Sequence, residues 1–117
     1  MTETTSQEDL SLEDRSLEDL SAETFRTQLH KAFSVAIEDD RSIDLELHEV
    51  VGLKGDTPRK DKSPFSVLFR GPSDVVLEQQ TLQLRNETLG ELLLFVVPLG
   101  PDLDDPERRI LYEAVFT

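Results

Sequence analysis

The chain has 117 residues, which is the length of a single domain, and its net charge is −13 from 25 acids and 12 bases. It has no cysteine and only two histidines, which excludes disulfides, thiolate metal sites and the usual zinc ligand sets. The acidic charge repels phosphates and anionic lipids, so we expect neither nucleic acid nor a membrane as a partner.

The first 19 residues are acidic and low in complexity. They lack the pattern of a secretory signal, and no run in the chain approaches the roughly 20 apolar residues of a membrane helix. We expect residues 1–19 to be a disordered tail, residues 20–117 to be one domain, and the protein to be cytoplasmic or incorporated into a larger assembly. In a second interpretation, Leu10, Leu17 and Leu20 share a helical face that a partner's groove induces.

The sequence predicts a short helix over residues 22–30. Ser21 is suited to cap it, and Leu20 and Phe25 have the spacing of a hydrophobic staple. Phe25, Leu29 and Phe33 recur at four-residue spacing, so the helix can lay one apolar stripe on a sheet and plug one open end.

A hairpin and a basic loop follow. Apolar and polar residues alternate over residues 33–37 and 43–47, with turn-forming acids between them, which predicts two paired strands. Glycine and proline mark residues 52–62 as a loop, which is either solvated or in contact with an acidic surface. Its basic residues, which are candidate interaction residues, are Lys54, Arg59, Lys60 and Lys62.

Residues 63–72 contain a short apolar run that is bounded by proline and glycine. Phe65, Val67 and Phe69 share one face at strand spacing and predict a core strand. Arg70 follows, just before a glycine and a proline. We expect it to meet a carboxylate of this chain, from Glu113 or Glu91, or one of a partner.

The second half of the chain predicts three more strands, over residues 81–85, 91–97 and 110–116. Residues 86–90 read as a hairpin connection. The strand over residues 91–97 is apolar on both faces and should end at Pro98, so we expect it to be central or covered by the helix or another subunit. The expected fold is mainly β, a small antiparallel barrel or sandwich of about six strands with one short N-terminal helix.

An acidic loop lies between the last two predicted strands, with Asp102, Asp104, Asp105 and Glu107. Calcium is the alternative to a solvated loop here. The spacing lacks the glycine and the glutamate of an EF-hand, so we expect no metal and no cofactor.

Several motifs together carry a resemblance. They are Leu-Ser-Ala-Glu-Thr-Phe at residues 20–25, Pro-Phe-Ser-Val-Leu-Phe-Arg-Gly-Pro at residues 64–72, and Tyr-Glu-Ala-Val-Phe at residues 112–116. The chain resembles an uncharacterised family of short bacterial proteins, a domain of unknown function, over residues 20–117. Members of that family look to be encoded beside tail-collar or tail-fibre-like proteins of phage type. The resemblance implies a role in a tail-like or fibre-like assembly and brings no catalytic residues.

Three functions remain open. The first is a non-enzymatic interaction or structural protein that binds a fibre-like partner or copies of itself. The second is an assembly chaperone or inhibitor that acts through the acidic tail. The third is a small-ligand-binding or enzymatic barrel, in which Arg70, Tyr112 and either His48 or Glu113 line a mouth.

Overall fold

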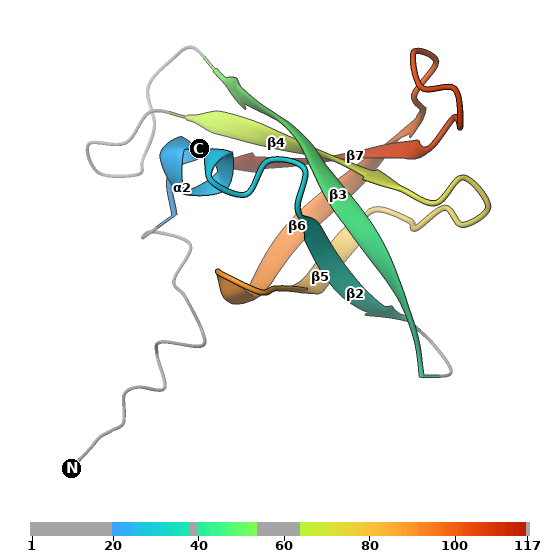
Figure 1. Ribbon diagram of the computed structural model, residues 1–117, viewed down its shortest axis with the longest axis horizontal. Coiled ribbons are helices and arrows are strands. Elements are labelled where there is room, and N and C mark those ends of the chain that lie inside the picture. The colour runs from blue at the N-terminus through green and yellow to red at the C-terminus, as the bar shows by residue number, and fades with distance from the viewer. Residues whose placement is uncertain (1–19, 38–39, 54–63, 117) are drawn as a thin grey trace.

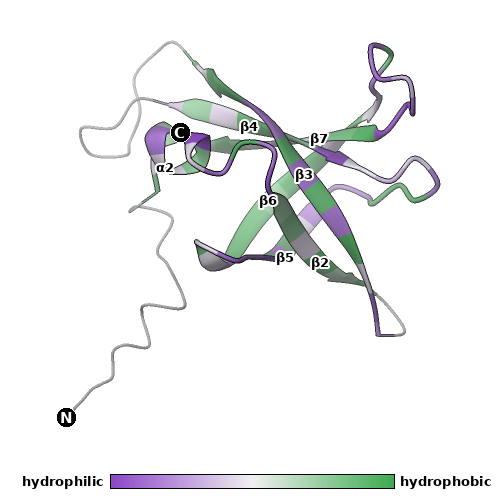
Figure 2. Ribbon diagram, viewed as in Figure 1, coloured by the Kyte–Doolittle hydropathy of each residue, from purple (hydrophilic) through white to green (hydrophobic). Residues whose placement is uncertain are grey.

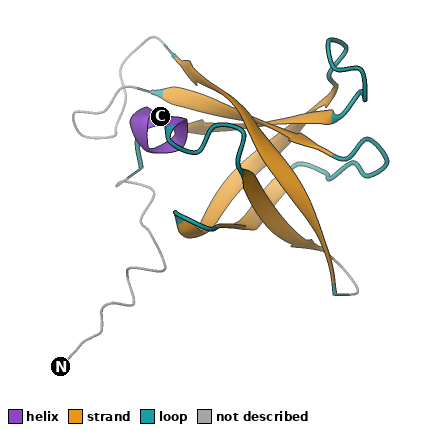
Figure 3. Ribbon diagram, in the orientation of Figure 1, coloured by secondary structure: helices purple, strands orange, loops and turns teal. Residues whose placement is uncertain are grey.

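The computed structural model describes residues 20–37, 40–53 and 64–116. One short helix precedes six strands (Figures 1 and 3). The elements are α2 (Ala22–Arg26), β2 (Ala32–Ile37), β3 (Arg41–Gly52), β4 (Phe65–Gly71), β5 (Gln80–Asn86), β6 (Gly90–Pro101) and β7 (Ile110–Phe116).

The six strands form a closed barrel in the order β2-β3-β4-β7-β6-β5, and every neighbouring pair is antiparallel. The predicted mainly-β fold is therefore confirmed, and the barrel alternative is the correct one. Each of the two long strands, β3 and β6, pairs with one neighbour along its first part and with another along its second part. β3 pairs first with β2 and then with β4, and β6 pairs first with β5 and then with β7.

The predicted helix cap is present, but the helix is shorter than expected. Ser21 Oγ accepts a hydrogen bond from the Thr24 amide, 3.2 Å away, as an N-cap side chain does. The helix ends at Arg26 rather than near residue 30. His30 adopts a positive φ of 68°, and its amide donates to the carbonyl of Leu47 on β3 at 2.7 Å. This bond directs the chain into β2 and ends the helix early.

Aromatic side chains fill the end of the barrel where α2 lies. The Phe65 and Phe116 rings stack with centroids 4.6 Å apart, and Phe25 of α2 lies 5.3 Å from Phe116 and 5.9 Å from Phe65. Phe33 joins them through contacts with Phe25 and Phe69. All five rings are buried, so the predicted core face of β4 is confirmed.

The structure corrects the expected end of β6 and the expectation that the helix covers its outer face, while cover by another subunit stays a prediction. The strand continues past Pro98 to Pro101, because a bulge between Pro98 and Gly100 accommodates a residue without an amide hydrogen. Its outer face is not dry, since Leu93 and Phe95 are 59% and 53% exposed. The helix does not cover them, because α2 packs against β3 and β4. Figure 2 shows β6 as a mostly hydrophobic strand.

The connection between β5 and β6 is a tight turn, as predicted. Asn86 is buried, and its Oδ1 accepts hydrogen bonds from the amides of Thr88 and Leu89 at 2.9 and 2.8 Å. Its Nδ2 donates to the carbonyl of Ala32, which ties the turn to β2. Gly90 supplies the positive φ of 78° that closes the hairpin.

Candidate interaction site

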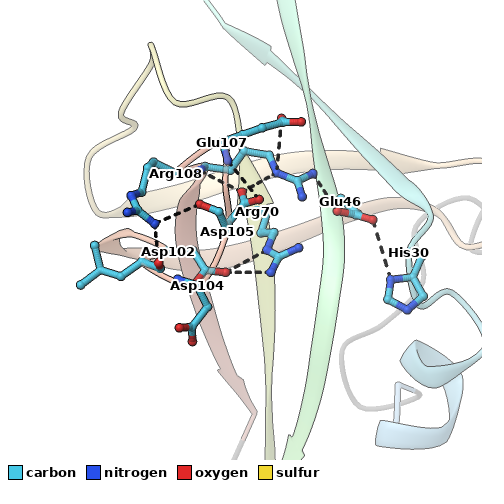
Figure 4. Close-up of polar contacts among 10 residues, drawn as sticks. His30, Glu46, Arg70, Asp102, Asp104, Asp105, Glu107 and Arg108 are labelled. Carbon is cyan, nitrogen blue, oxygen red and sulfur yellow. Dashed lines mark hydrogen bonds and ion pairs between the residues drawn. The ribbon is translucent and has the colours of Figure 1, made fainter.

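An ion pair anchors the loop after β6 to the barrel wall. Arg70 on β4 donates from Nε and Nη2 to Oδ2 of Asp102, at 3.0 and 2.8 Å (Figure 4). Arg70 therefore meets Asp102 rather than the predicted Glu113 or Glu91. Asp102 also accepts the Asp104 amide on its other oxygen, and this bond, followed by that from Arg70, lowers the pKa of the carboxyl.

A second buried carboxylate holds the other end of the same loop. Asp105 Oδ2 accepts the side-chain Nε of Arg109 at 2.8 Å and the Arg109 amide at 3.0 Å. The guanidinium hydrogen bond is the main reason that the pKa of Asp105 lies well below its ordinary value. Arg109 also donates to Glu46 on β3, at 3.0 Å, and His30 Nδ1 lies 3.7 Å from the other oxygen of Glu46.

Residues 102–109 thus form a closed turn. Arg108, with a positive φ of 53°, donates from Nη1 to the carbonyls of Leu103 and Asp105. Among the residues that the structure describes, no group of three or more histidine, aspartate or glutamate side chains could hold a metal ion. The two buried carboxylates of the calcium alternative, Asp102 and Asp105, have arginine and amide partners instead.

The neighbouring segment, residues 72–79, is fixed by a tyrosine. The hydroxyl of Tyr112 accepts the Leu77 amide at 2.9 Å and donates to the Val75 carbonyl at 3.4 Å. Burial raises the pKa of this phenol. Both loops leave the barrel where Gly71 pairs with Ile110, so they project from the same end, away from α2 (Figure 1).

Apolar side chains protrude from both of these fixed loops. Leu103 is 74% exposed and Val76 is 61% exposed, the highest values among the large hydrophobic residues that the structure describes. Exposed acids flank them on the same loops, including Asp104 and Glu107. We refer to residues 72–79 and 102–109 together as the loop face.

The other predicted interaction residues do not lie on the loop face in the described part of the chain. Leu10 and Leu17 lie outside the described residues, as do Lys54, Arg59, Lys60 and Lys62. Leu20 is fully buried in the core, so its side chain stabilises the barrel and does not offer a docking face.

Two groups of the proposed catalytic or ligand-binding mouth, Arg70 and Tyr112, bind different partners, whereas His48 lies close enough to Asp102 to help lower the pKa of that carboxyl. The polar atoms of Arg70 bind Asp102, whereas the hydroxyl of Tyr112 binds the backbone of residues 75 and 77. Sequence reasoning missed the roles of Asp105 and Arg109. The signal available for them was an aspartate and an arginine at a four-residue spacing within one loop.

One family model matches this chain, over residues 20–116, and its description is a domain of unknown function, DUF6916. The chain belongs to this family. The match spans the barrel and α2, in agreement with the resemblance to an uncharacterised family. No curated protein and no solved structure matches the chain. In the described part of this DUF6916 protein, no helix is both long enough and apolar enough to cross a membrane.

Proposed function

We propose that this DUF6916 protein is a non-enzymatic interaction or structural protein and that the loop face is its contact surface. The observation that carries the proposal is the exposure of Leu103 at 74%, on a loop whose two ends are held by arginine–carboxylate pairs. A leucine exposed on a loop that is held at both ends is available for an apolar contact with a partner.

Rigidity is what makes such a loop useful for binding. Association costs free energy for every side chain and loop that must be ordered at the interface. Here the Arg70–Asp102 and Arg109–Asp105 pairs order one loop, and the Tyr112 hydroxyl orders the other, before any partner arrives. A partner that buries Leu103 and Val76 gains hydrophobic free energy with little further ordering cost.

The charges of the loop face indicate the kind of partner. Asp102 and Asp105 are neutralised by arginines, whereas Asp104 and Glu107 are exposed around Leu103. An apolar pocket with a neutral or basic rim complements this arrangement. Buried polar groups that are already paired also support a binding role over catalysis, which needs groups free to exchange protons with a substrate.

The proposal extends to the biological setting. We propose that the protein is an accessory component of a phage-tail-like or fibre-like assembly and acts in the cytoplasm or as part of that assembly. The support is the resemblance of the three motifs to a bacterial family whose members look to be encoded beside tail-collar or tail-fibre-like proteins. A fibre-like protein is the partner that this setting favours.

Two other functions are alternatives to this proposal. An assembly chaperone or inhibitor would act through residues 1–19, and deletion of those residues would abolish its binding while leaving the melting temperature unchanged. A small-ligand-binding barrel would need space inside the barrel, where the aromatic cluster of Phe25, Phe33, Phe65 and Phe116 packs one end.

Affinity capture followed by mass spectrometry tests the proposal, with the captured protein then purified and rebound. The wild-type chain should bind the captured protein, and the Leu103→Asp variant should not. Leu53→Asp is the matched control, because Leu53 is a partly exposed leucine at the opposite end of the barrel. Equal retention by Leu103→Asp and the wild type would show that the loop face is not the contact surface.

A further inference from the structure

One half of β6 has a strand on only one side. Residues 90–96 pair with β5, from Asn86↔Gly90 to Gln80↔Val96, and the pairing with β7 begins only at Val97. In Figure 1, β6 and β7 diverge from their shared end toward the side where α2 lies. Within the part of the chain that the structure describes, residues 90–96 therefore have a free edge, on which backbone amides and carbonyls lack a ladder partner.

The side chains at this edge are apolar on both faces of the sheet. Leu92, Leu94 and Val96 point into the core, while Leu93 and Phe95 point outward and are 59% and 53% exposed. The single charge, Glu91, is at the start of the segment and is engaged by Arg85 and Gln83. Residues 92–96 of the free edge thus lack the charges, prolines and bulges that proteins use to prevent strand addition.

The other long strand provides an internal comparison. Residues 41–45 of β3 pair with β2, and the pairing with β4 begins at Glu46, so this half also has one side without a neighbouring strand among the described residues. Its outward residues are polar, since Ser42 and Asp44 are exposed. Both long strands, β3 and β6, therefore have a half that pairs with one neighbour only, and the outward side chains of that half are apolar only in β6.

We propose that the free edge of β6 binds an extended segment of another protein by adding it as a strand. Main-chain hydrogen bonds to residues 91–96 would supply affinity, and apolar side chains at alternate positions would pack beside Leu93 and Phe95. The binding segment is neutral or basic, because this chain carries a net charge of −13 and the outward neighbour on β7, Glu113, has no ion-pair partner among the described residues.

This charge favours a different protein over a second copy. A second copy would bring the same net charge of −13 to the edge, whereas a basic segment is attracted to it. The free edge is at the N-terminal end of β6. The loop face begins after Pro101, at the other end of the strand. The two surfaces are therefore separate, and the strand-addition site does not depend on the function proposed for the loop face.

Amide hydrogen exchange on the full chain tests the proposal in two steps. In the free protein, the amides of residues 92–96 that point away from β5 should exchange faster than those that point toward β5. A short peptide of alternating valine and threonine with a lysine at each end should then slow the fast amides. Uniformly slow exchange in the free monomer, or no slowing by this peptide at millimolar concentration, would overturn the proposal.

Two comparison peptides and three variants identify the mode of binding. Replacing the central valine of the peptide with proline should abolish the protection, and glutamate ends should weaken it. Phe95→Lys and Leu93→Lys should each weaken peptide binding by about tenfold or more. Ser42→Lys, on the free half of β3, is the matched control and should bind as the wild type does.

Three results would contradict strand addition by a separate protein. Equal binding of the proline peptide would show that main-chain pairing is not used. Equal binding by Phe95→Lys and Leu93→Lys, with melting temperatures like that of the wild type, would place the peptide elsewhere. Protection of residues 92–96 that rises with protein concentration, together with a dimer in analytical ultracentrifugation, would show that a second copy occupies the edge.

Discussion

Arg70 and Asp102 are 32 residues apart in the sequence, yet two hydrogen bonds of 3.0 and 2.8 Å join them. The pair connects the C-terminal end of β4 to the loop that carries Leu103. Because both groups are largely shielded from water, neither can lose its partner without leaving a charge in a poorly solvated position. The pair therefore fixes the position of the loop relative to β4.

Removing either member of this pair should lower the melting temperature and loosen the loop. We expect Arg70→Ala and Asp102→Asn each to destabilise the protein, and the double variant to be less destabilised than the sum of the two, because the lost interaction is the same. Urea unfolding of all four proteins measures this coupling. Strictly additive effects would mean that the two side chains act independently.

Acid should weaken the loop through Asp105. Its folded-state pKa is depressed, so its contribution to stability is present above the ordinary aspartate pKa of about 3.9 and is lost as the pH falls below that value. The difference in unfolding free energy between the wild type and Asp105→Asn should be largest at neutral pH and should shrink in acid. A difference that stays constant with pH would rule out this linkage.

Tyr112→Phe isolates the hydroxyl that holds residues 72–79. Loss of the bond from the Leu77 amide should cost about 1 kcal/mol and should accelerate hydrogen exchange at that amide. In the wild type, the raised pKa of the phenol means that ionisation favours the unfolded state above a pH of about 10, so stability falls there. Tyr112→Phe has no phenol to ionise and should lose less stability at alkaline pH. Unchanged exchange at Leu77 would show that the hydroxyl does not fix the loop.

Gly71→Ala tests the close packing beneath the loop face. A Cβ at this position would lie 2.7 Å from Cδ2 of Leu45 and 3.1 Å from Cε2 of Tyr112, both in fully buried side chains. We expect a loss of about 1 to 3 kcal/mol of stability. Gly52→Ala is the matched control, because a Cβ there has no neighbour within 4 Å. Similar stability of the two variants would contradict the packing described at Gly71.

Local patterns predicted the elements of this fold well. The helix cap at Ser21, the core face of β4 and the hairpin of β2 and β3 depend on neighbouring residues, and all three are present. The end of α2 and the passage of β6 through Pro98 were predicted wrongly, since they depend on a bond to β3 and on a bulge against β7.

The loop face could be predicted only in part, for the same reason. The acidic composition of residues 102–107 is visible in the sequence, but its physical meaning depends on distant arginines. Asp102 looks like a solvated acid or a metal ligand until Arg70 is placed beside it. Nothing in the local pattern shows that Leu103 is the residue left exposed.

Titration calorimetry with the purified partner tests the central claim most directly, that the loop face binds a protein through Leu103. The wild type and Leu53→Asp should bind with the same Kd, and Leu103→Asp should bind at least about tenfold more weakly, because a buried apolar contact would be replaced by a charge. If Leu103→Asp binds with the wild-type Kd, the loop face is not the contact surface of this protein.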